Sequence, residues 1–379
     1  MAMFLIRSIL FMSLIWYSAF SDDVRVDVVH WDLEKTSGTL LRMDDVQMKV
    51  VDNSGSVESI LLDEVACVLF RNTPEASERD SVKFDSTGFL HQVTGGRLTG
   101  KPVFDATAFT WKNWWTGASL EDLSVIRSFN MVDSTDFSGL SEVEDVVSLS
   151  NQDRLAGFID SIENGVIALE KTDGTTLRVP LKNVDRVRFA NPLKKSSGPS
   201  IWSTRGDRFQ IESIQFVADS GFTVSGRSMS QNLLNGIVFQ GERITPLSVV
   251  PVTLHQTKNT PRFHLPKPLI DQRFSPFDAS SIELSGPIRA EWRLGQKGLG
   301  FVCRVMVPRS ALSSADMRIR ILDGEIPLTT FILDASSPAE DVSVRLSGNI
   351  LVIEVLDGGN GPIMDRIRIE EALLITPDS

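Results

Sequence analysis

The sequence predicts an all-β protein, with tandem small β-barrel-like repeats followed by a C-terminal β-sandwich or jelly roll. Three observations support this fold class. Apolar and polar residues alternate along many short runs, a similar run of apolar positions recurs about every 50–60 residues, and helical periodicity is scarce beyond the N-terminal segment. At 379 residues the chain is long enough for several compact units.

Residues 1–21 have the features of a cleavable secretory signal peptide. Arg7 supplies a positive charge, residues 9–17 form an apolar core too short to span a bilayer, and residues 19–21 place small side chains at the cleavage positions. An uncleaved membrane anchor is the alternative. No later stretch reaches the apolar length of a transmembrane helix. We therefore expect a secreted or periplasmic chain with no integral membrane segment after signal cleavage.

The recurring pattern marks the end of each repeat. LDEVACVLF at 62–70 matches LKNVDRVRF at 181–189, with apolar residues at the same four offsets. Partial copies occur at Leu120, Leu123 and Ile126, and at Leu234, Ile237 and Phe239. Alternating runs and hairpin residues such as Asp173-Gly174 precede the copies, which is typical of a β-meander. The predicted β-repeats are 24–72, 81–132, 145–191 and 200–248. Their pattern resembles Sm-like and SH3-like small barrels, which implies the fold alone.

A Pro-rich passage at 249–271 is predicted to link the repeats to a last domain at 272–379. That domain contains about eight alternating runs at a spacing of 8–12 residues, the signature of a sandwich or jelly roll. The runs include GFVCRVMV at 300–307, MRIRIL at 317–322 and ILVIEV at 350–355. Cys67 and Cys303 both occupy strand positions, and we expect two buried thiols there instead of a disulfide bridge.

Several of these late segments resemble the NPCBM/NEW2 module, a galactose-binding-like jelly roll. The resemblance rests on LDGE at 322–325, DVSVRLSG at 341–348, ILVIEV at 350–355 and DRIRIEEAL at 365–373. It implies that the jelly roll of an exported bacterial protein binds carbohydrate or cell-envelope glycan. Asp323, Asp365 and Arg366 are the candidate ligand-binding residues within these segments.

Aromatic residues supply the other candidates for sugar binding. The densest cluster comprises Trp111, Trp114 and Trp115, with Phe104, Phe109, Lys112 and Asn113 nearby. Sugars stack on aromatic faces, and the Lys112 and Asn113 side chains supply hydrogen bonds to hydroxyl groups. Packing between neighbouring repeats is the alternative for this cluster. On a strand Trp114 and Trp115 face opposite sides, so one of them is expected to be exposed or held in an interface. Trp292 is a further candidate, with core packing as its alternative.

Catalysis and cofactors find little support in the sequence. No G-x-S-x-G, Walker or G-x-G-x-x-G motif occurs, and the four histidines lack metal-ligand spacing. Asp357 and Asn360 lie in a turn rich in oxygen ligands, which makes a structural calcium ion the one candidate cofactor, with a plain hairpin turn as the alternative. The net charge of −11 argues against a nucleic-acid partner. We expect a non-catalytic exported protein that binds glycan, or alternatively a scaffold that docks envelope proteins.

Overall fold

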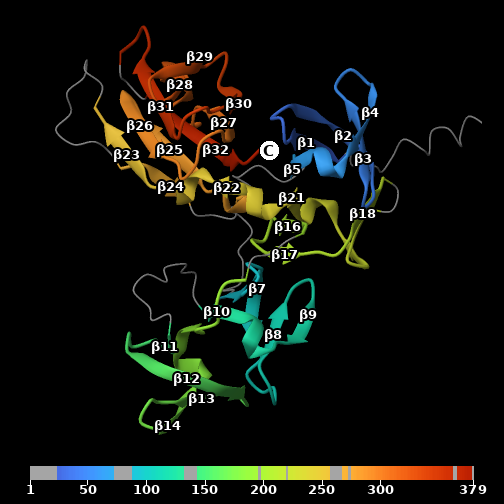
Figure 1. The fold of residues 1–379 in the computed structure, drawn as a ribbon, viewed down its shortest axis with the longest axis vertical. Coiled ribbons are helices and arrows are strands. Elements are labelled where there is room, and N and C mark those ends of the chain that lie inside the picture. The colour runs from blue at the N-terminus through green and yellow to red at the C-terminus, as the bar shows by residue number, and fades with distance from the viewer. Residues whose placement is uncertain are drawn as a thin grey trace, which may run out of the picture.

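The computed structural model describes residues 24–71, 88–131, 143–194, 198–218, 221–256, 267–271, 275–361 and 365–377. The expected signal peptide lies outside these residues. The described chain is almost entirely antiparallel β-structure, which confirms the predicted fold class. Four small β-units precede a two-sheet sandwich (Figure 1). None of the helices in the described ranges has the length and apolarity needed to cross a membrane.

The first unit is a five-stranded meander whose last strand returns to pair with its first. Its strands are β1 (Arg25–His30), β2 (Lys35–Met43), β3 (Gln47–Asp52), β4 (Val57–Leu61) and β5 (Val65–Phe70). Each strand pairs with the next up to β4, and β5 pairs with β1, with Val68 opposite Val28. The strands alternate because one face packs inward, so Met48 and Val50 are buried while Lys49 between them is exposed.

The second and third units repeat this order, and the fourth has six strands, with its last strand again paired to its first. The second contains β6 (Gly88–Gln92), β7 (Arg97–Pro102), β8 (Thr110–Asn113), β9 (Gly117–Leu120) and β10 (Ile126–Asn130). The third contains β11 (Asp145–Leu149), β12 (Arg154–Glu163), β13 (Val166–Glu170), β14 (Thr176–Pro180) and β15 (Val184–Arg188). The fourth contains β16 (Ser200–Ser203), β17 (Arg208–Gln210), β18 (Ile214–Val217), β19 (Gly221–Val224), β20 (Arg227–Met229) and β21 (Leu234–Val238).

The recurring sequence pattern forms a 3-10 turn followed by the last strand of each unit. These turns are η2 (Leu62–Glu64), η3 (Leu123–Val125), η4 (Leu181–Asn183) and η5 (Gln231–Leu233). The expected frame of the second copy is wrong by three residues. Leu120 ends β9 and is 73% exposed, so the pattern starts at Leu123 and its first buried strand residue is Ile126. Apolar residues spaced three apart at 120, 123 and 126 fit either frame, which is why spacing alone misplaced the copy.

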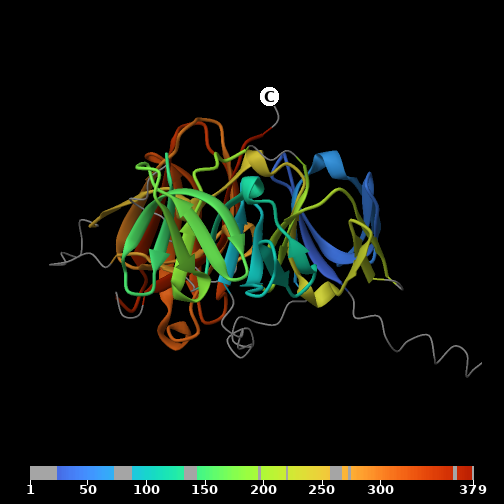
Figure 2. The ribbon, with the colours of Figure 1, turned by 90° about the horizontal axis from the view of Figure 1, so that it is seen from below.

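The units associate through their last strands. β5 pairs with β21, with Val68 opposite Ile237, and β10 pairs with β15, with Phe129 opposite Val187. The first unit is thereby joined to the fourth and the second to the third (Figures 1 and 2). One hydrophobic core cluster runs through all four units. A unit of this size buries little apolar surface alone, and shared cores between neighbours increase that burial.

We expect the buried His91 to make the stability of the second unit depend on pH. It lies on β6, opposite Arg97 of β7 and Ser128 of β10, and burial together with the neighbouring Arg97 lowers its pKa to about 4. In the unfolded chain His91 therefore binds a proton near pH 6.5, whereas in the folded chain it binds one only near pH 4. We expect the free energy of unfolding to fall by about 2–3 kcal/mol between pH 6.5 and pH 4. Urea unfolding of the unaltered protein and of a His91→Gln variant across this pH range measures the effect. The variant should lose the part of the pH dependence of stability that His91 contributes.

The C-terminal sandwich is built from two antiparallel sheets. One contains β24 (Leu269–Asp271), β25 (Ser281–Ser285), β32 (Arg366–Ile375), β27 (Gly300–Met306) and β30 (Ala339–Arg345), with β22 (Ile244–Pro246) also paired to β32. The other contains β23 (Val252–His255), β26 (Ile288–Arg293), β31 (Ile350–Asp357), β28 (Asp316–Asp323) and β29 (Ile326–Asp334). Short 3-10 turns lie at η6 (Gly241–Arg243), η7 (Leu247–Val249), η8 (Pro276–Asp278) and η9 (Leu312–Ser314).

The segment expected to be a linker belongs in part to the sandwich. β23 pairs with β26, and β24 pairs with β25, so residues 249–271 contribute two strands. Each of them pairs with a single strand, at the edge of its sheet. Proline is tolerated near edge strands because an edge leaves some backbone N–H groups outside the ladder. A Pro-rich composition therefore did not exclude strands here.

An apolar cluster joins the first and fourth units to the sandwich. Trp31, Trp202 and Phe277 pack there with residues of β5, β27 and β32, and the rings of Trp202 and Phe277 meet edge to face at 5.3 Å. Cys67 is buried in this junction and Cys303 in the sandwich core, and both thiols are free, which confirms the expectation of two buried thiols. The sandwich and the first unit lie side by side at one end of the molecule (Figure 1).

Candidate functional site

The aromatic cluster of the second unit is divided between three environments. Trp111 and Phe109 are buried in the shared core, where Phe109 stacks on Phe129 with ring centroids 5.0 Å apart. Trp111 is 0% exposed, so it presents no face to a ligand, and the packing alternative holds for it. Phe104 is 46% exposed at the surface.

Trp114 and Trp115 pack between the second and fourth units. They follow β8 in a turn, so the expected strand geometry with opposite-facing rings is wrong. Trp114 donates its indole N–H to Asp207 Oδ2 at 2.6 Å, and Trp115 meets Phe209 edge to face at 4.7 Å. Asp207 is fully buried and also accepts from Thr99 and Asn113. The two indoles therefore stabilise the junction between the second and fourth units.

Most of the candidates expected in the sandwich have structural roles. Trp292 is 1% exposed within the sandwich core, which excludes it as a sugar platform. Asp323 is buried and accepts hydrogen bonds from the backbone N–H groups of Ser347 and Gly348, which fixes the turn before β31. Asp365 is 2% exposed, and its backbone oxygen accepts from Gly286. Arg366 is exposed on β32 opposite Ser285, and its role in ligand binding stays a prediction.

Hydrogen bonds to Ser314 and Asp316 hold the turn proposed for calcium in place. Gly359 donates its backbone N–H to Asp316 Oδ2 at 2.7 Å, and the Asn360 side-chain amide donates to the Ser314 carbonyl at 2.8 Å. Asp357 Oδ1 is buried and has no hydrogen-bond partner among the described residues. The described ranges contain no group of three or more His, Cys, Asp or Glu side chains able to hold a metal ion. Calcium ligation by Asp357 and Asn360 stays a prediction.

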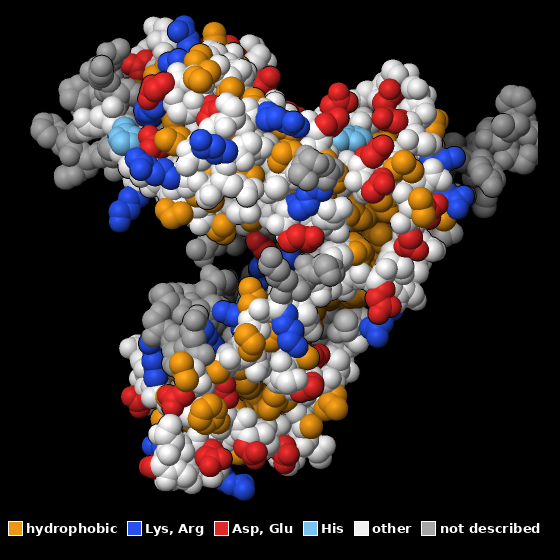
Figure 3. Space-filling model, in the orientation of Figure 1, with side chains coloured by type: hydrophobic (Ala, Val, Ile, Leu, Met, Phe, Trp, Pro, Cys, Tyr) orange, Lys and Arg blue, Asp and Glu red, His pale blue; other side chains and the backbone are white. Residues whose placement is uncertain are grey.

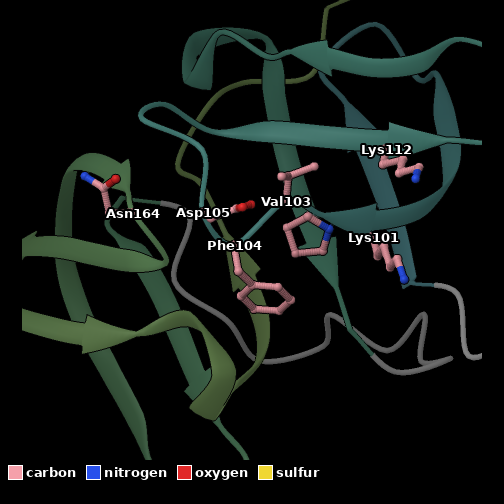
Figure 4. Close-up of a pocket in the computed structure, with 7 residues that line it drawn as sticks. Lys101, Val103, Phe104, Asp105, Lys112 and Asn164 are labelled. Carbon is pink, nitrogen blue, oxygen red and sulfur yellow. The ribbon is translucent and has the colours of Figure 1, made fainter.

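A surface pocket opens beside the exposed Phe104, where the second unit meets the third. It has a volume of about 540 Å³ and is lined by Lys101, Pro102, Val103, Phe104, Asp105, Lys112 and Asn164 (Figure 4). Lys101 lies on β7 and Lys112 on β8, while Phe104 and Asp105 belong to the loop between these strands. Pockets of this size accept small molecules.

The third unit completes the pocket through one tight turn. Asn164 and Gly165 join β12 to β13 with positive φ angles of 49° and 70°, the geometry that an Asn-Gly hairpin favours. The Asn164 backbone N–H donates to the Ala106 carbonyl at 2.8 Å. A Cβ atom on Gly165 would lie 2.8 Å from the Phe104 carbonyl oxygen, so only glycine allows this close approach. The turn therefore fixes the Asn164 backbone beside the loop that carries Phe104.

None of the three clustered tryptophans predicted to bind sugar lines this pocket, whereas Phe104 and Lys112 from the same stretch of sequence do. No pattern in the sequence marks Lys101, Asp105 or Asn164 as binding residues. The Asn-Gly pair at 164–165 was the available signal for a fixed turn. Nothing in the sequence indicated which loop that turn would contact.

A second, more polar cleft of about 630 Å³ lies between the first unit and the sandwich. Its wall contains a network of ion pairs. Arg71 donates from Nε to Asp27 at 2.6 Å and from both terminal nitrogens to Glu371 at 2.6 and 2.8 Å. Lys35 bridges Asp27 at 3.0 Å and Asp341 at 2.8 Å. We call these five residues the ionic clasp.

A β-bulge aims Glu371 at Arg71. The register between β27 and β32 shifts between Val302 and Arg304, and Glu371 has a φ of 52°, in the left-handed region. Bulges bend a strand and redirect a side chain, and a non-glycine residue held there costs conformational free energy. Here the redirected carboxylate reaches across to the first unit. The clasp is therefore a structural device at the junction, and its polar residues leave little apolar surface for a sugar ring.

Comparisons with known proteins found distant structural similarity and no family. No protein-family model and no curated protein matches the chain. A CBM51 module from a Clostridium perfringens GH95 protein, solved with methyl-galactose, is 14% identical, with a TM-score of 0.27 over 35% of this chain and 99% of that chain. The CBM51-2 and INT domains of C. perfringens ZmpB, solved with GlcNAc, are 14% identical, with a TM-score of 0.29 over 47% and 43%.

A third match is the CBM36-1 domain of a multidomain xylanase from the hindgut metagenome of Trinervitermes trinervoides. It is 11% identical, with a TM-score of 0.20 over 34% of this chain and 99% of that chain. These structural neighbours are carbohydrate-binding modules. At these identities and scores they assign no ligand to this chain, and the pocket beside Phe104 has to be judged on its own chemistry.

Proposed function

We propose that the protein is a non-catalytic carbohydrate-binding protein that acts outside the cytoplasm and holds its sugar in the pocket beside Phe104. The observation that carries the proposal is an exposed aromatic ring surrounded by polar side chains from two β-units. The C–H face of a sugar packs on an aromatic ring, and orienting hydrogen bonds come from a few polar groups. Phe104 supplies the ring and Asp105, Asn164, Lys101 and Lys112 supply the polar groups.

This proposal moves the sugar site from the sandwich to the repeats. The sandwich candidates Trp292, Asp323 and Asp365 are buried, whereas every polar residue of the pocket is exposed. The side chains of these four polar residues form no hydrogen bond or ion pair with another described residue, so their donors and acceptors are available to a ligand. Export through residues 1–21 remains part of the proposal.

The chemistry of the pocket favours binding over hydrolysis. Its lining contains one carboxylate, that of Asp105. Glycosidases mostly use a pair of carboxylates on either side of the scissile bond, one acting as acid and the other as base or nucleophile. The Phe104 pocket therefore holds a sugar without the second group that cleavage requires.

A Phe104→Ala variant of the full chain tests the proposal. We expect a glycan panel to identify ligands for the unaltered protein, and the variant to bind them about tenfold more weakly because the stacking surface is lost. Titration calorimetry with the selected saccharide provides the affinities. Phe158→Ala is the matched control, since Phe158 is 51% exposed on β12 and does not line the pocket.

Equal affinities of the Phe104→Ala variant and the unaltered protein would place the sugar elsewhere. No binding to any saccharide by the folded chain would leave the scaffold as the better explanation. One feature favours that alternative: β4 pairs only with β3 among the described strands, and it exposes Val57 and Leu61 along this edge. Open strand edges are sites where another chain can add a strand.

A further inference from the structure

Two lysines at one end of the Phe104 pocket lie opposite each other on neighbouring strands, with no acidic partner among the described residues. Lys101 on β7 and Lys112 on β8 are direct cross-strand partners, and both are exposed. Like charges directly opposite each other destabilise a strand pair. Neither ammonium group forms an ion pair with another described residue. The hairpin thus keeps a repulsive pair that an anion placed between the two groups would relieve.

The two positive groups are a local feature of an acidic protein. The chain has a net charge of −11, and basic and acidic side chains are mixed over the face seen in Figure 3. A long-range positive field therefore does not account for anion binding here. The attraction is confined to the end of the pocket where Lys101 and Lys112 lie.

The charged and polar groups that line the pocket differ between its two ends. Lys101 and Lys112 lie on one side of Phe104, while Asp105 and Asn164 lie toward the other side (Figure 4). A carboxylate bound between the lysines forms charge-assisted hydrogen bonds, which are the stronger kind. Asp105 accepts hydrogen bonds from hydroxyl groups and repels a second anionic group. The pocket is therefore suited to a ring with a carboxylate on one side and hydroxyl groups on the other.

We propose that the ligand is an acidic saccharide, with the carboxylate of a uronic or sialic acid held between Lys101 and Lys112 and its ring packed on Phe104. The inference rests on the proposed function and specifies its substrate class. Polyanions such as nucleic acids and densely sulfated glycans fit less well, because Asp105 places a negative charge at the other end of the same pocket.

Matched acidic and neutral sugars test this substrate class. The probes are methyl glucuronide against methyl glucoside, methyl galacturonide against methyl galactoside, and the methyl glycoside of N-acetylneuraminic acid, each titrated into the full chain. We expect at least one acid to bind about tenfold more tightly than its neutral counterpart, because hydrogen bonds to charged groups contribute more to binding than neutral ones. The preference should shrink as NaCl rises from about 20 mM to about 500 mM, since salt screens exposed charges.

The Lys101→Gln/Lys112→Gln double variant should lose this preference while its affinity for neutral sugars changes little. Lys49→Gln/Lys182→Gln is the control, because it makes the same change in net charge at two exposed lysines outside the pocket. Thermal unfolding without ligand checks the folding of the variants, and the lysine pair variant should unfold at an unchanged or higher temperature.

The outcomes separate the two proposals. If sugars bind through Phe104 but acids bind no better than neutral sugars, or if the preference survives in the Lys101→Gln/Lys112→Gln variant, the acidic-sugar inference is overturned and the proposed function stands. If neither class of sugar binds, or if Phe104→Ala has no effect on binding, the proposed function fails and the inference fails with it.

Discussion

Replacement of Trp292 by alanine is expected to lower the free energy of unfolding of the sandwich by about 3–5 kcal/mol. Trp292 lies on β26 between Val252 of β23 and Leu351 of β31, and its side chain is 1% exposed. Loss of the indole removes a large buried apolar surface and leaves a cavity that the two sheets cannot fill by small movements. The variant therefore acts on the stability of the sandwich and has no direct effect on the Phe104 pocket.

Urea unfolding of the full chain, followed by far-ultraviolet circular dichroism, measures this effect. Arg293→Ala is the neighbouring control, because the Arg293 side chain is 80% exposed and its removal should change stability by less than about 0.5 kcal/mol. If the Trp292→Ala variant kept the stability of the unaltered protein but lost sugar binding, the indole would have to act as a ligand platform.

The alternation of apolar and polar residues predicted the strands well. In β26, Ala290 and Trp292 are buried while Arg293 is exposed, as expected for a strand with one face on a core. The same periodicity predicted the first-unit strands and the alternating runs of the sandwich. It works because a half-buried strand places every second residue in the same environment, wherever that strand lies in the molecule.

The pocket could not be predicted in the same way. Lys101, Phe104 and Lys112 belong to one hairpin region, but Asn164 comes from the third unit. Their proximity depends on the pairing of β10 with β15 and on the contact of the Asn164 backbone with Ala106. Such contacts between units leave no periodic signal in the sequence. Aromatic content alone was also ambiguous, because a tryptophan stabilises a core or a junction between units through the same apolar surface that would bind a sugar.

The second large effect is expected at the ionic clasp. Replacement of Arg71 by methionine should lower the free energy of unfolding by about 3 kcal/mol or more, since removal of one partner from a buried ion pair leaves its counter-charges unsatisfied. Arg71 binds both Asp27 of β1 and Glu371 of β32. Methionine keeps much of the apolar part of the arginine side chain, so the loss of stability reflects mainly the missing guanidinium charge. Urea unfolding of the full chain near pH 7 provides the measurement.

The pH dependence of the Arg71→Met effect follows from Asp27. Burial raises the pKa of this carboxyl group, but the charge of Arg71 and hydrogen bonds from Ser37 and Lys35 outweigh burial and hold the pKa below its ordinary value. A lowered pKa means that the stabilisation is present above the unfolded pKa and is lost as pH falls through the folded pKa. In the Arg71→Met variant the pKa of Asp27 should rise toward its unfolded value, so this carboxyl group should contribute less acid destabilisation. The difference in stability between the variant and the unaltered protein should therefore shrink as pH falls through the unfolded pKa of Asp27.

A second substitution separates the charge from the packing. The double variant Arg71→Met/Glu371→Gln removes the negative charge of Glu371 together with the positive charge of Arg71. It should therefore recover part of the stability lost in the Arg71→Met variant. Recovery would mean that the Glu371 carboxylate, which the bulge directs toward the first unit, lowers the stability of the fold only when Arg71 is missing. If instead the single variant unfolds like the unaltered protein, the apolar cluster around Trp31, Trp202 and Phe277 and the remaining polar contacts are enough to hold the first and fourth units to the sandwich. The strained backbone at Glu371 would then need a cause other than the clasp.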